Sequence, residues 1–335
     1  MTDLHIISKK GKITKSDEHL LFRDIEGNET RILPSKINQI LLYDNISITG
    51  EAFNILAKNK IPLAIKTYNG IDNILIQYEN SKNVFLRQNQ YRIADNPELS
   101  LEIAKQIVIG KIKNQLTFLQ RIKRTDNLIS SENNEELTTV NELKENLKNI
   151  DTCKSLAALR GIEGISSRLY FSVFGLHIKP KWAVFKNRSK NPPKSNVNAT
   201  LSFLYSLLEY EVTFAVQTKG LDSMIGTLHE LCYGRNSLTY DLMEEFRAPI
   251  ADTLCCYLFN DNILSEEDFE EREGGIYLIK TGLKKVVAAF EEKLEKSIKY
   301  GEKYCTYREL IFNQSEKYKK MIMNKEEFYE PFKYK

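Results

Sequence analysis

Short runs of apolar residues, separated by turn-forming residues, fill the first 88 positions of the chain. Alternating apolar positions over runs of this length predict β-strands, and the Gly, Asn, Asp and Pro residues between them predict turns. One helix interrupts the series, because Thr49 is placed to cap a segment in which Phe53 and Leu56 form an apolar stripe. The predicted strands are LHIIS, HLLFRDIEG, TRILP, INQILLYDN, PLAIKTYNG and NILIQY. Strands at this spacing predict a small sandwich or a rolled sheet over residues 1–88.

After residue 88 the apolar residues recur at helical spacing. Ile103, Ile107 and Ile112 form the stripe of a long predicted helix. The same helix is strongly basic, which indicates either a solvated face or contact with DNA. Its basic residues are Lys105, Lys111, Lys113, Arg121, Lys123 and Arg124. A polar connector over residues 126–136 then leads to a second amphipathic helix that ends near residue 150.

The remainder of the chain keeps this helical spacing. The predicted helices cover residues 151–175, 200–219, 238–252, 284–300 and 307–323. The segment GGIYLIKTG predicts a short hairpin-like insert, and the tail after Glu326 is expected to be loose. The predicted fold class is therefore α+β, with a small β-rich N-terminal domain (1–88) followed by a larger all-helical C-terminal domain (89–335).

The bulk composition limits the class of protein more than it identifies it. A chain of 335 residues that is 42% hydrophobic and 28% charged has ample core for one large or two ordinary domains. Its net charge of +3 neither demands nor excludes nucleic acid, so the local charge distribution must decide. The start lacks a signal-peptide pattern, and no apolar stretch reaches the ~18 residues of a membrane span. Because the five cysteines include no C-x-x-C pair, they indicate buried free thiols in a cytoplasmic protein with no membrane partner.

Residues 179–200, KPKWAVFKNRSKNPPKSNVNAT, carry six Lys or Arg residues and no acidic residue. Trp182 and Phe185 lie among the basic positions, and Pro192–Pro193 excludes a helix there. Basic residues interleaved with aromatic ones are typical of loops that contact phosphates and stack on bases. The alternative interpretation is an ordinary solvated loop.

The segment 220–252, GLDSMIGTLHELCYGRNSLTYDLMEEFRAPIAD, carries most of the candidate chemistry. Its predicted second half is a helix on which four acids fall on one side: Asp241, Glu244, Glu245 and Asp252. His229 lies just before the intervening turn, so its imidazole can meet the acids if the two halves form a hairpin. One imidazole with carboxylates suits Mn²⁺ or Mg²⁺. The alternative is that Asp241 and Glu244 are solvated acids of a first helical turn and that His229 packs in the core.

A further candidate, Glu163, lies in the middle of the helix predicted over residues 151–175. Its neighbours in DTCKSLAALRGIEGISSRLYFSVFG are mostly apolar or small. A carboxylate in such surroundings is costly unless it is paired or binds a cation. Surface exposure is the alternative.

With these residues in view, the sequence resembles the family of CRISPR-associated integrases, the metal-dependent DNA endonucleases of spacer acquisition. The resemblance covers roughly residues 85–300 and depends on several motifs in the same order and spacing. These are LRQNQYRIADNPELSLEIAKQIVIGKIKNQ, RGIEG with the following Tyr170 and Phe171, NPPKSNVNATLSFLYSLL, GLDSMIGTLH, GRNSLTYDLMEEFRAPIAD and GGIYL. It implies a β-rich N-terminal domain that forms a homodimer and a helical C-terminal domain that holds the active site.

The resemblance also implies roles for individual residues. Glu163, His229 and Glu244 match the family's metal ligands for Mg²⁺ or Mn²⁺, although some members have Asp at the third position. Asp241 matches a nearby auxiliary catalytic acid. The implied reaction joins the 3′-hydroxyl ends of captured foreign DNA to the CRISPR repeat, and water as nucleophile gives the endonuclease activity.

The implied partners are double-stranded DNA and a small ferredoxin-like protein that bridges two dimers. The basic residues expected to guide the DNA backbone are Lys181, Lys186, Arg188, Lys190 and Arg247. Two other functions stay open: a catalytically idle DNA-binding scaffold of the same fold, and an unrelated helical metal hydrolase that acts on a small phosphoester. Intact Glu163, His229 and Glu244 argue against the first. The number of basic residues argues against the second, since a small substrate needs only one or two cations.

Overall fold

The computed structural model describes residues 2–66, 73–76, 83–125, 134–324 and 328–334. The chain forms two compact units, Met1–Glu79 and Asn80–Lys335. Strands dominate the first unit and helices the second, which confirms the α+β class. The units divide before helix α2 (Val84–Ala94), whereas the predicted boundary at residue 88 falls inside that helix. The side chain of Asn83 accepts a hydrogen bond from the amide three residues later and so begins α2 ahead of that boundary.

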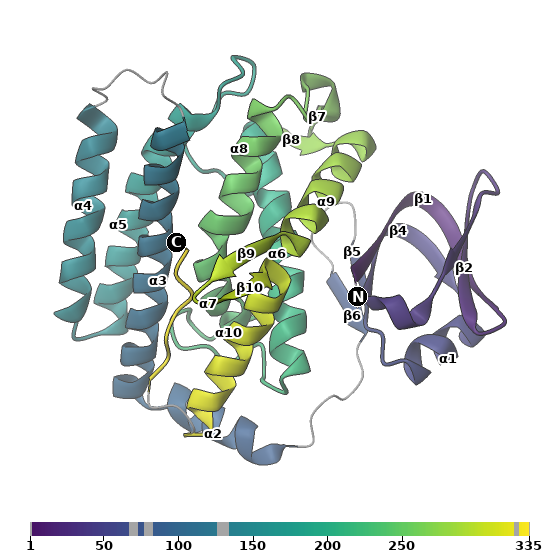
Figure 1. Cartoon of the computed structure of the whole chain (residues 1–335), viewed down its shortest axis with the longest axis horizontal. Helices are drawn as coiled ribbons and strands as arrows, with labels where there is room; N and C mark the ends of the chain where they lie inside the picture. Colours follow the sequence, from purple (N-terminus) through teal and green to yellow (C-terminus); the bar gives the residue numbers. More distant parts are fainter. Residues whose placement is uncertain (1, 67–72, 77–82, 126–133, 325–327, 335) are drawn as a thin grey trace. The chain divides into compact units, whose positions relative to one another are not determined.

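One mixed sheet of six strands forms the N-terminal unit, in the order β3-β2-β1-β4-β5-β6. The strands are β1 (Thr2–Ser16), β2 (His19–Asp24), β3 (Glu29–Ile32), β4 (Ile37–Ile48), β5 (Leu63–Lys66) and β6 (Asn73–Ile76). Strand β4 runs parallel to β1 and β5, and the other neighbours are antiparallel. Each predicted run contributes to a strand, although residues 67–70 and 77–78 lie outside the described residues. The single sheet is strongly curved in Figure 1, as the rolled-sheet alternative predicts.

The core of this unit lies between the sheet and helix α1 (Gly50–Lys58). The Thr49 hydroxyl accepts a hydrogen bond from the Ala52 amide at 3.3 Å, which is the predicted cap. Ile13, Ile40 and other aliphatic side chains of the sheet are fully buried against the helix. Each such side chain stabilises the unit by about 1.5–3 kcal/mol, so the alternating pattern accounts for the local fold.

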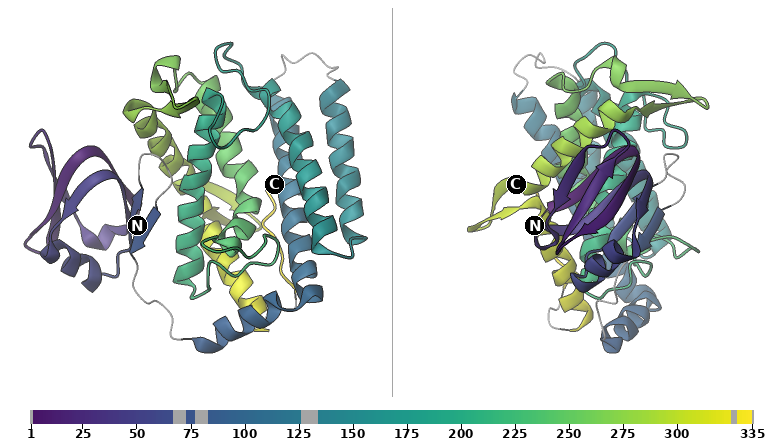
Figure 2. Two further views of the ribbon diagram at one scale, coloured as in Figure 1. Left: turned by 180° about the vertical axis from the view of Figure 1, so that it is seen from behind. Right: turned by 90° about the vertical axis from the view of Figure 1, so that its right-hand side faces the viewer.

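Helices form most of the C-terminal unit. Besides α2, they are α3 (Pro97–Thr125), α4 (Asn134–Asp151), α5 (Leu156–Phe174), α6 (Asn196–Thr218), α7 (Ser237–Phe246), α8 (Thr253–Asn260), α9 (Lys280–Glu295) and α10 (Tyr307–Ile322). Helices α3, α4 and α5 lie side by side, and α7 packs against both α3 and α6 (Figures 1 and 2). Short 3₁₀ turns lie at Pro34–Lys36, Gly175–His177 and Glu266–Asp268. Because α6 is apolar nearly all round, it lies in the middle of the unit.

The helical unit departs from the prediction at two places, within residues 238–252 and at the second of two hairpins. The helix predicted over 238–252 is α7 followed by one stretch of π-helix, η3 (Arg247–Asp252). Two hairpins interrupt the helices, β7 (Phe269–Arg272) with β8 (Gly275–Leu278) and β9 (Ser297–Tyr300) with β10 (Lys303–Thr306). The first contains the predicted GGIYL insert. The second follows Lys296, where the backbone becomes extended and ends α9 earlier than predicted.

The C-terminal tail is ordered against the helices, so the prediction of a loose tail is wrong for residues 328–334. Phe332 is 1% exposed and stacks on Phe246 with the ring centroids 4.9 Å apart. Tyr329 is also buried, and its hydroxyl donates to Glu245 Oε1 at 2.5 Å. We call residues 328–334 the C-terminal strap.

Two sequence expectations about the whole chain can be compared with the described residues. None of the helices in the described ranges is long and apolar enough to cross a membrane. None of the five cysteines, all of which the structure describes, forms a disulfide. Cys232, in the loop before α7, is exposed and Cys305 is half-buried, so the expectation of buried thiols holds only for Cys153, Cys255 and Cys256.

Candidate active site

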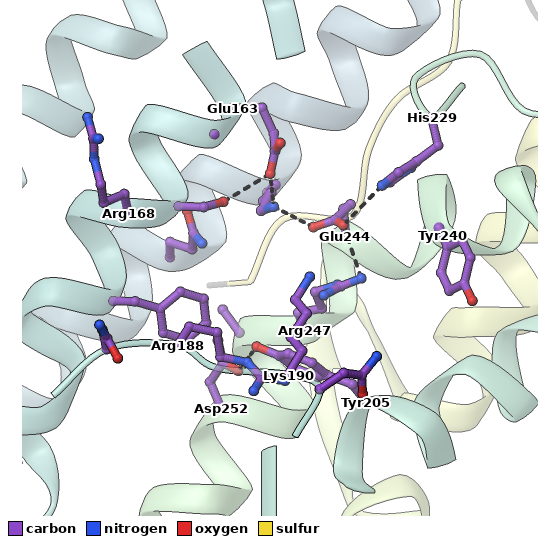
Figure 3. Close-up of a pocket in the computed structure, with 18 of the residues that line it drawn as sticks. Glu163, Arg168, Arg188, Lys190, Tyr205, His229, Tyr240, Glu244, Arg247 and Asp252 are labelled. Carbon is purple, nitrogen blue, oxygen red and sulfur yellow. Dashed lines mark hydrogen bonds and ion pairs between the residues drawn. The ribbon is translucent and has the colours of Figure 1, made fainter. Parts of the chain in front are cut away.

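A pocket of about 970 Å³ opens in the helical unit, where α3, α5, α6 and α7 approach the basic loop 179–195 (Figure 3). Carboxylates, one imidazole and several basic groups line it together. The charged and titratable lining residues are Lys111, Glu163, Arg168, Lys186, Arg188, Lys190, Tyr205, His229, Tyr233, Arg235, Tyr240, Glu244, Arg247 and Asp252. This composition fits a site that holds a cation and an anionic substrate together.

Two glutamates from different helices meet at one lysine in this pocket. Glu163 comes from α5 and Glu244 from α7, and both carboxylates pair with the ammonium group of Lys111 on α3. The distance from Lys111 Nζ to Glu244 Oε2 is 2.7 Å. Glu163 Oε1 also accepts a hydrogen bond from the Ser167 hydroxyl at 2.9 Å. Glu163 is therefore paired, as its apolar surroundings in the sequence require.

His229 approaches the same carboxylates from the loop before α7. Its Nε2 lies 3.8 Å from Glu244 Oε1, and its Nδ1 lies 2.8 Å from Asp241 Oδ1. Because an ionised carboxylate only accepts, Nδ1 carries a proton, and in the neutral ring Nε2 then carries the lone pair. Asp241 thus selects the tautomer of His229 and orients its ring.

Asp241 also holds the loop that carries the histidine. Its buried carboxylate accepts hydrogen bonds from the backbone amides of Thr227, Leu228 and His229 at 2.6, 3.0 and 2.9 Å. The loop approaches α7 so closely at Gly226 that a Cβ there would lie 2.5 Å from Asp241 Oδ2. Glycine is the residue that permits this approach.

Cations keep Glu244 ionised although its side chain is only 4% exposed. Burial alone would raise the pKa of Glu244, but opposing charges, chiefly those of Arg247 and Lys111, lower it to about 2. Arg247 Nη2 lies 3.2 Å from Glu244 Oε1. Conversely, burial would lower the pKa of Lys111, but the carboxylates of Glu244 and Glu163 raise it. The pocket therefore contains charged groups of both signs at neutral pH.

A third buried acid, Asp252, lies at the end of η3 and contacts two phenols. The hydroxyls of Tyr205 and Tyr170 donate to its carboxylate at 2.6 and 2.8 Å. Burial raises the pKa of Asp252 to about 6, against the opposing effect of these hydrogen bonds and of nearby arginines. The guanidinium groups of Arg188 and Arg247 lie over the Tyr205 ring, at 5.4 and 4.7 Å from its centroid. The π-helical turn places Asp252 in the pocket wall, and such turns are frequent at functional sites.

Comparison with known families identifies the family of the chain as a whole. The family model described as CRISPR associated protein Cas1 matches residues 4–292. This chain belongs to the Cas1 family. A relative from Thermus thermophilus, named CRISPR-associated endonuclease Cas1 3, is 36% identical over 254 residues, which are 75% of this chain and 72% of the relative.

Solved structures extend the Cas1 similarity to the whole fold. A casposase bound to its integration product is 26% identical and has a TM-score of 0.88, covering 100% of this chain and 95% of its own. A chain of a Cas6-RT-Cas1--Cas2 complex has a TM-score of 0.83 at 22% identity, covering 99% of this chain and 36% of its own. The second likeness shows the fold alone.

Most of the candidate residues of this Cas1 chain lie together. Glu163, His229 and Glu244 face one another, and Asp241 contacts His229 from behind. The solvated-acid alternative is wrong for Asp241 and Glu244, which are both buried. Of the basic candidates, four line the pocket: Lys186, Arg188, Lys190 and Arg247. Lys181 is not among the described residues that line it.

The sequence interpretation is wrong in one detail. The four acids do not share one side, because Glu245 faces the C-terminal strap and η3 alters the helical spacing before Asp252. The aromatic residues of the basic loop are half-buried and contact other rings of the protein. Trp182 contacts the Phe259 ring with centroids 5.4 Å apart, and Phe185 contacts Phe174 at 5.3 Å.

Sequence reasoning missed Lys111 as a partner of the acids. The helix α3 was recognised as basic, but Lys111 follows Ile103 and Ile107 at intervals of four residues and so lies on the apolar stripe. A lysine on the buried face of a helix requires an anionic partner. That spacing is the signal that could have identified it. Arg168 and Arg235 also line the pocket and carried no comparable signal.

Proposed function

We propose that this chain is a metal-dependent DNA endonuclease and integrase of CRISPR adaptation, which joins the 3′-hydroxyl ends of captured DNA fragments to the CRISPR repeat. The observation that carries the proposal is the convergence of Glu163, His229 and Glu244 in one pocket, where a single cationic group already contacts both carboxylates. The name of the Thermus endonuclease and the integration product bound to the casposase support the same reaction class.

The three residues fit Mg²⁺ or Mn²⁺. Two carboxylates and one neutral imidazole nitrogen form a donor set for a hard divalent cation, and the low pKa of Glu244 keeps that ligand ionised. The proton held on Nδ1 by Asp241 leaves Nε2 of His229 available as a ligand. When bound, the metal supplies Lewis-acid polarisation of the scissile phosphate and activation of the attacking oxygen.

The remaining residues have roles toward the DNA. Asp241 is a positioning residue, because it fixes the loop and the tautomer of His229. Lys186 and Lys190 line the same pocket and offer cations to the phosphates, as does Arg247 beside Glu244. Arg188 donates to Asn198 and Ser202, and this bracing orients its guanidinium group along the pocket wall. We propose that Lys181, which is not among the lining residues, contacts a DNA phosphate outside the pocket, because it belongs to the same basic loop.

Long DNA fits this pocket better than a small phosphoester. Basic groups from α5, the loop 179–195 and the turn before α7 surround the acids, and a small substrate would use only one or two of them. The intact acidic set argues against an idle scaffold. For assembly we propose a homodimer through the β-rich unit and a small ferredoxin-like partner, a role that the Cas2 of the complex named above can fill.

The test is a strand-transfer assay on a supercoiled plasmid with a CRISPR array, using a short duplex with free 3′-hydroxyls and Mn²⁺. We expect joined product with the wild type, none with a chelator, and none with His229→Ala. His19→Ala, which removes a half-buried histidine of the β-rich unit, is the matched control and should retain joining. Equal joining by His229→Ala and the wild type would contradict the assigned site.

A further inference from the structure

Lys111 occupies an unusual position for a lysine. It lies in the middle of α3, it is 7% exposed, and its ammonium group reaches Glu163 and Glu244 at once. Lys113, two residues further along the same helix, is exposed. Taking an ammonium group out of water costs several kcal/mol unless it is fully paired. The two carboxylates therefore offset the cost of burying the ammonium group of Lys111.

The carboxylates depend on the lysine in the same way. Glu163 and Glu244 come from separate helices, and with their charges facing one another they would repel without a cation between them. The ammonium group lies where one cation contacts an oxygen of each glutamate. This is also the relation that a divalent ion bound by both residues would have to them. The lysine and the metal thus compete for the same pair of ligands.

We propose that Lys111 is a built-in placeholder cation, which holds Glu163 and Glu244 in position in the metal-free protein and must withdraw for the metal to bind. Lys111 is thus a positioning residue and not a ligand. The proposal rests on the proposed metal site. If Lys111 acts in this way, the two carboxylates are already in position before the metal binds. The apparent metal affinity then decreases as the fraction of molecules in which Lys111 blocks the carboxylates increases.

Removal of the ammonium group should therefore strengthen metal binding. If Lys111 blocks the site in roughly nine of ten molecules, Lys111→Met binds Mn²⁺ about tenfold more tightly than the wild type. Methionine keeps an unbranched apolar side chain of similar length for packing against α3 neighbours. The metal-free variant should also melt at a lower temperature, since the two carboxylates lose their shared cation, and Mn²⁺ should restore the melting temperature.

Two control variants separate this effect from simpler ones. Lys113→Gln removes an exposed positive charge from the same helix and should change neither Mn²⁺ affinity nor melting. Arg247→Gln removes a cation that contacts Glu244 Oε1 at 3.2 Å without reaching Glu163. It measures the purely electrostatic gain in metal affinity, which should be smaller than that of Lys111→Met.

The experiment is a Mn²⁺ titration followed by electron paramagnetic resonance, with thermal melts of each protein with and without Mn²⁺. Tighter binding by Lys111→Met than by Arg247→Gln, with a melting temperature that Mn²⁺ restores, is the expected result. Equal affinities of Lys111→Met and the wild type, with binding lost in Glu163→Gln, would overturn the placeholder while the metal site stands. Binding by none of these proteins would overturn both. A Lys111→Met protein that stays unfolded at millimolar Mn²⁺ would also overturn the placeholder, because the metal should replace the ammonium group.

Discussion

Glu244 and Glu245 are consecutive on α7, and both are buried. Their surroundings leave the carboxyl group of Glu244 ionised and that of Glu245 protonated at neutral pH. Glu244 faces the pocket, where chiefly Arg247 and Lys111 overcome the effect of burial and lower its pKa to about 2. Glu245 faces the C-terminal strap, where burial raises its pKa to about 8 although Tyr329 and the Phe332 amide donate to it. One side of the helix is thus built for ionic chemistry and the other for packing.

The comparison teaches which neighbours allow a buried carboxylate to stay charged. Formal cations within about 4 Å stabilise the ionised form strongly enough to exceed the cost of desolvation, whereas two neutral donors do not. In the pocket the cations come from α3 and η3. At the strap the donors are one phenol and one amide, at 2.5 and 2.6 Å.

The largest expected difference between the two glutamates is in activity. Glu244→Gln removes a ligand charge from the proposed metal site, so Mn²⁺ affinity and DNA joining should fall about 100-fold or more. Glu245→Gln keeps a neutral side chain of the same shape against the strap, and joining should stay within a few fold of the wild type. Strand-transfer rates of the two variants measure the contrast. Similar losses in both would mean that the strap side also serves the chemistry.

A second difference is in stability, and it concerns the strap. Phe332→Ala removes a ring that is 1% exposed and stacked on Phe246, so the free energy of unfolding should fall by about 3–5 kcal/mol. Phe328, in the same strap, is 81% exposed, and Phe328→Ala is the matched control with little expected change. Denaturant titrations of both variants measure this. Equal midpoints for Phe332→Ala and the wild type would show that the strap does not stabilise the helical unit.

Local patterns in the sequence predicted much of this arrangement. The alternation before residue 88 predicted the strands, and Thr49 predicted the cap of α1. The apolar neighbours of Glu163 predicted that its carboxylate needs a partner. The assignment of Glu163, His229 and Glu244 to one site depended on the family resemblance, since the first residue lies far from the others along the chain. Helical spacing also predicted helix α7, but it did not predict which acidic residues of α7 face the pocket.

The parts that sequence could not give depend on contacts between distant segments. Asn114 on α3 donates to the carbonyls of Glu245 and Phe332 at 2.7 and 2.9 Å and so links the strap to α7, and no local pattern in the tail indicates these contacts. The π-helical turn at Arg247–Asp252 is likewise a tertiary feature. It moves Asp252 away from the spacing of a regular helix and toward the two tyrosines.

The third expected difference between the two sides is a pH dependence of stability, which is small for each pH unit. Glu245 is protonated in the folded protein up to a pKa of about 8, whereas the unfolded chain loses this proton near pH 4.5. Between these values the folded state binds more protons, so stability falls as the pH rises, by at most about 1.4 kcal/mol per pH unit from this group. Glu244 acts in the opposite direction and only at low pH, because its stabilising charge is lost as the pH falls from 4.5 toward 2.

Unfolding free energies measured from pH 5 to 8 can isolate the Glu245 contribution. Glu245→Gln cannot ionise, so its stability should decline less steeply over this range than that of the wild type. Glu142→Gln, at an exposed position on α4, controls for the loss of a surface charge and should keep the wild-type slope. Parallel slopes for Glu245→Gln and the wild type would mean that Glu245 is ionised in the fold. The strap would then hold a buried charge by hydrogen bonds alone, and the contrast between the two sides of α7 would lie only in which groups donate.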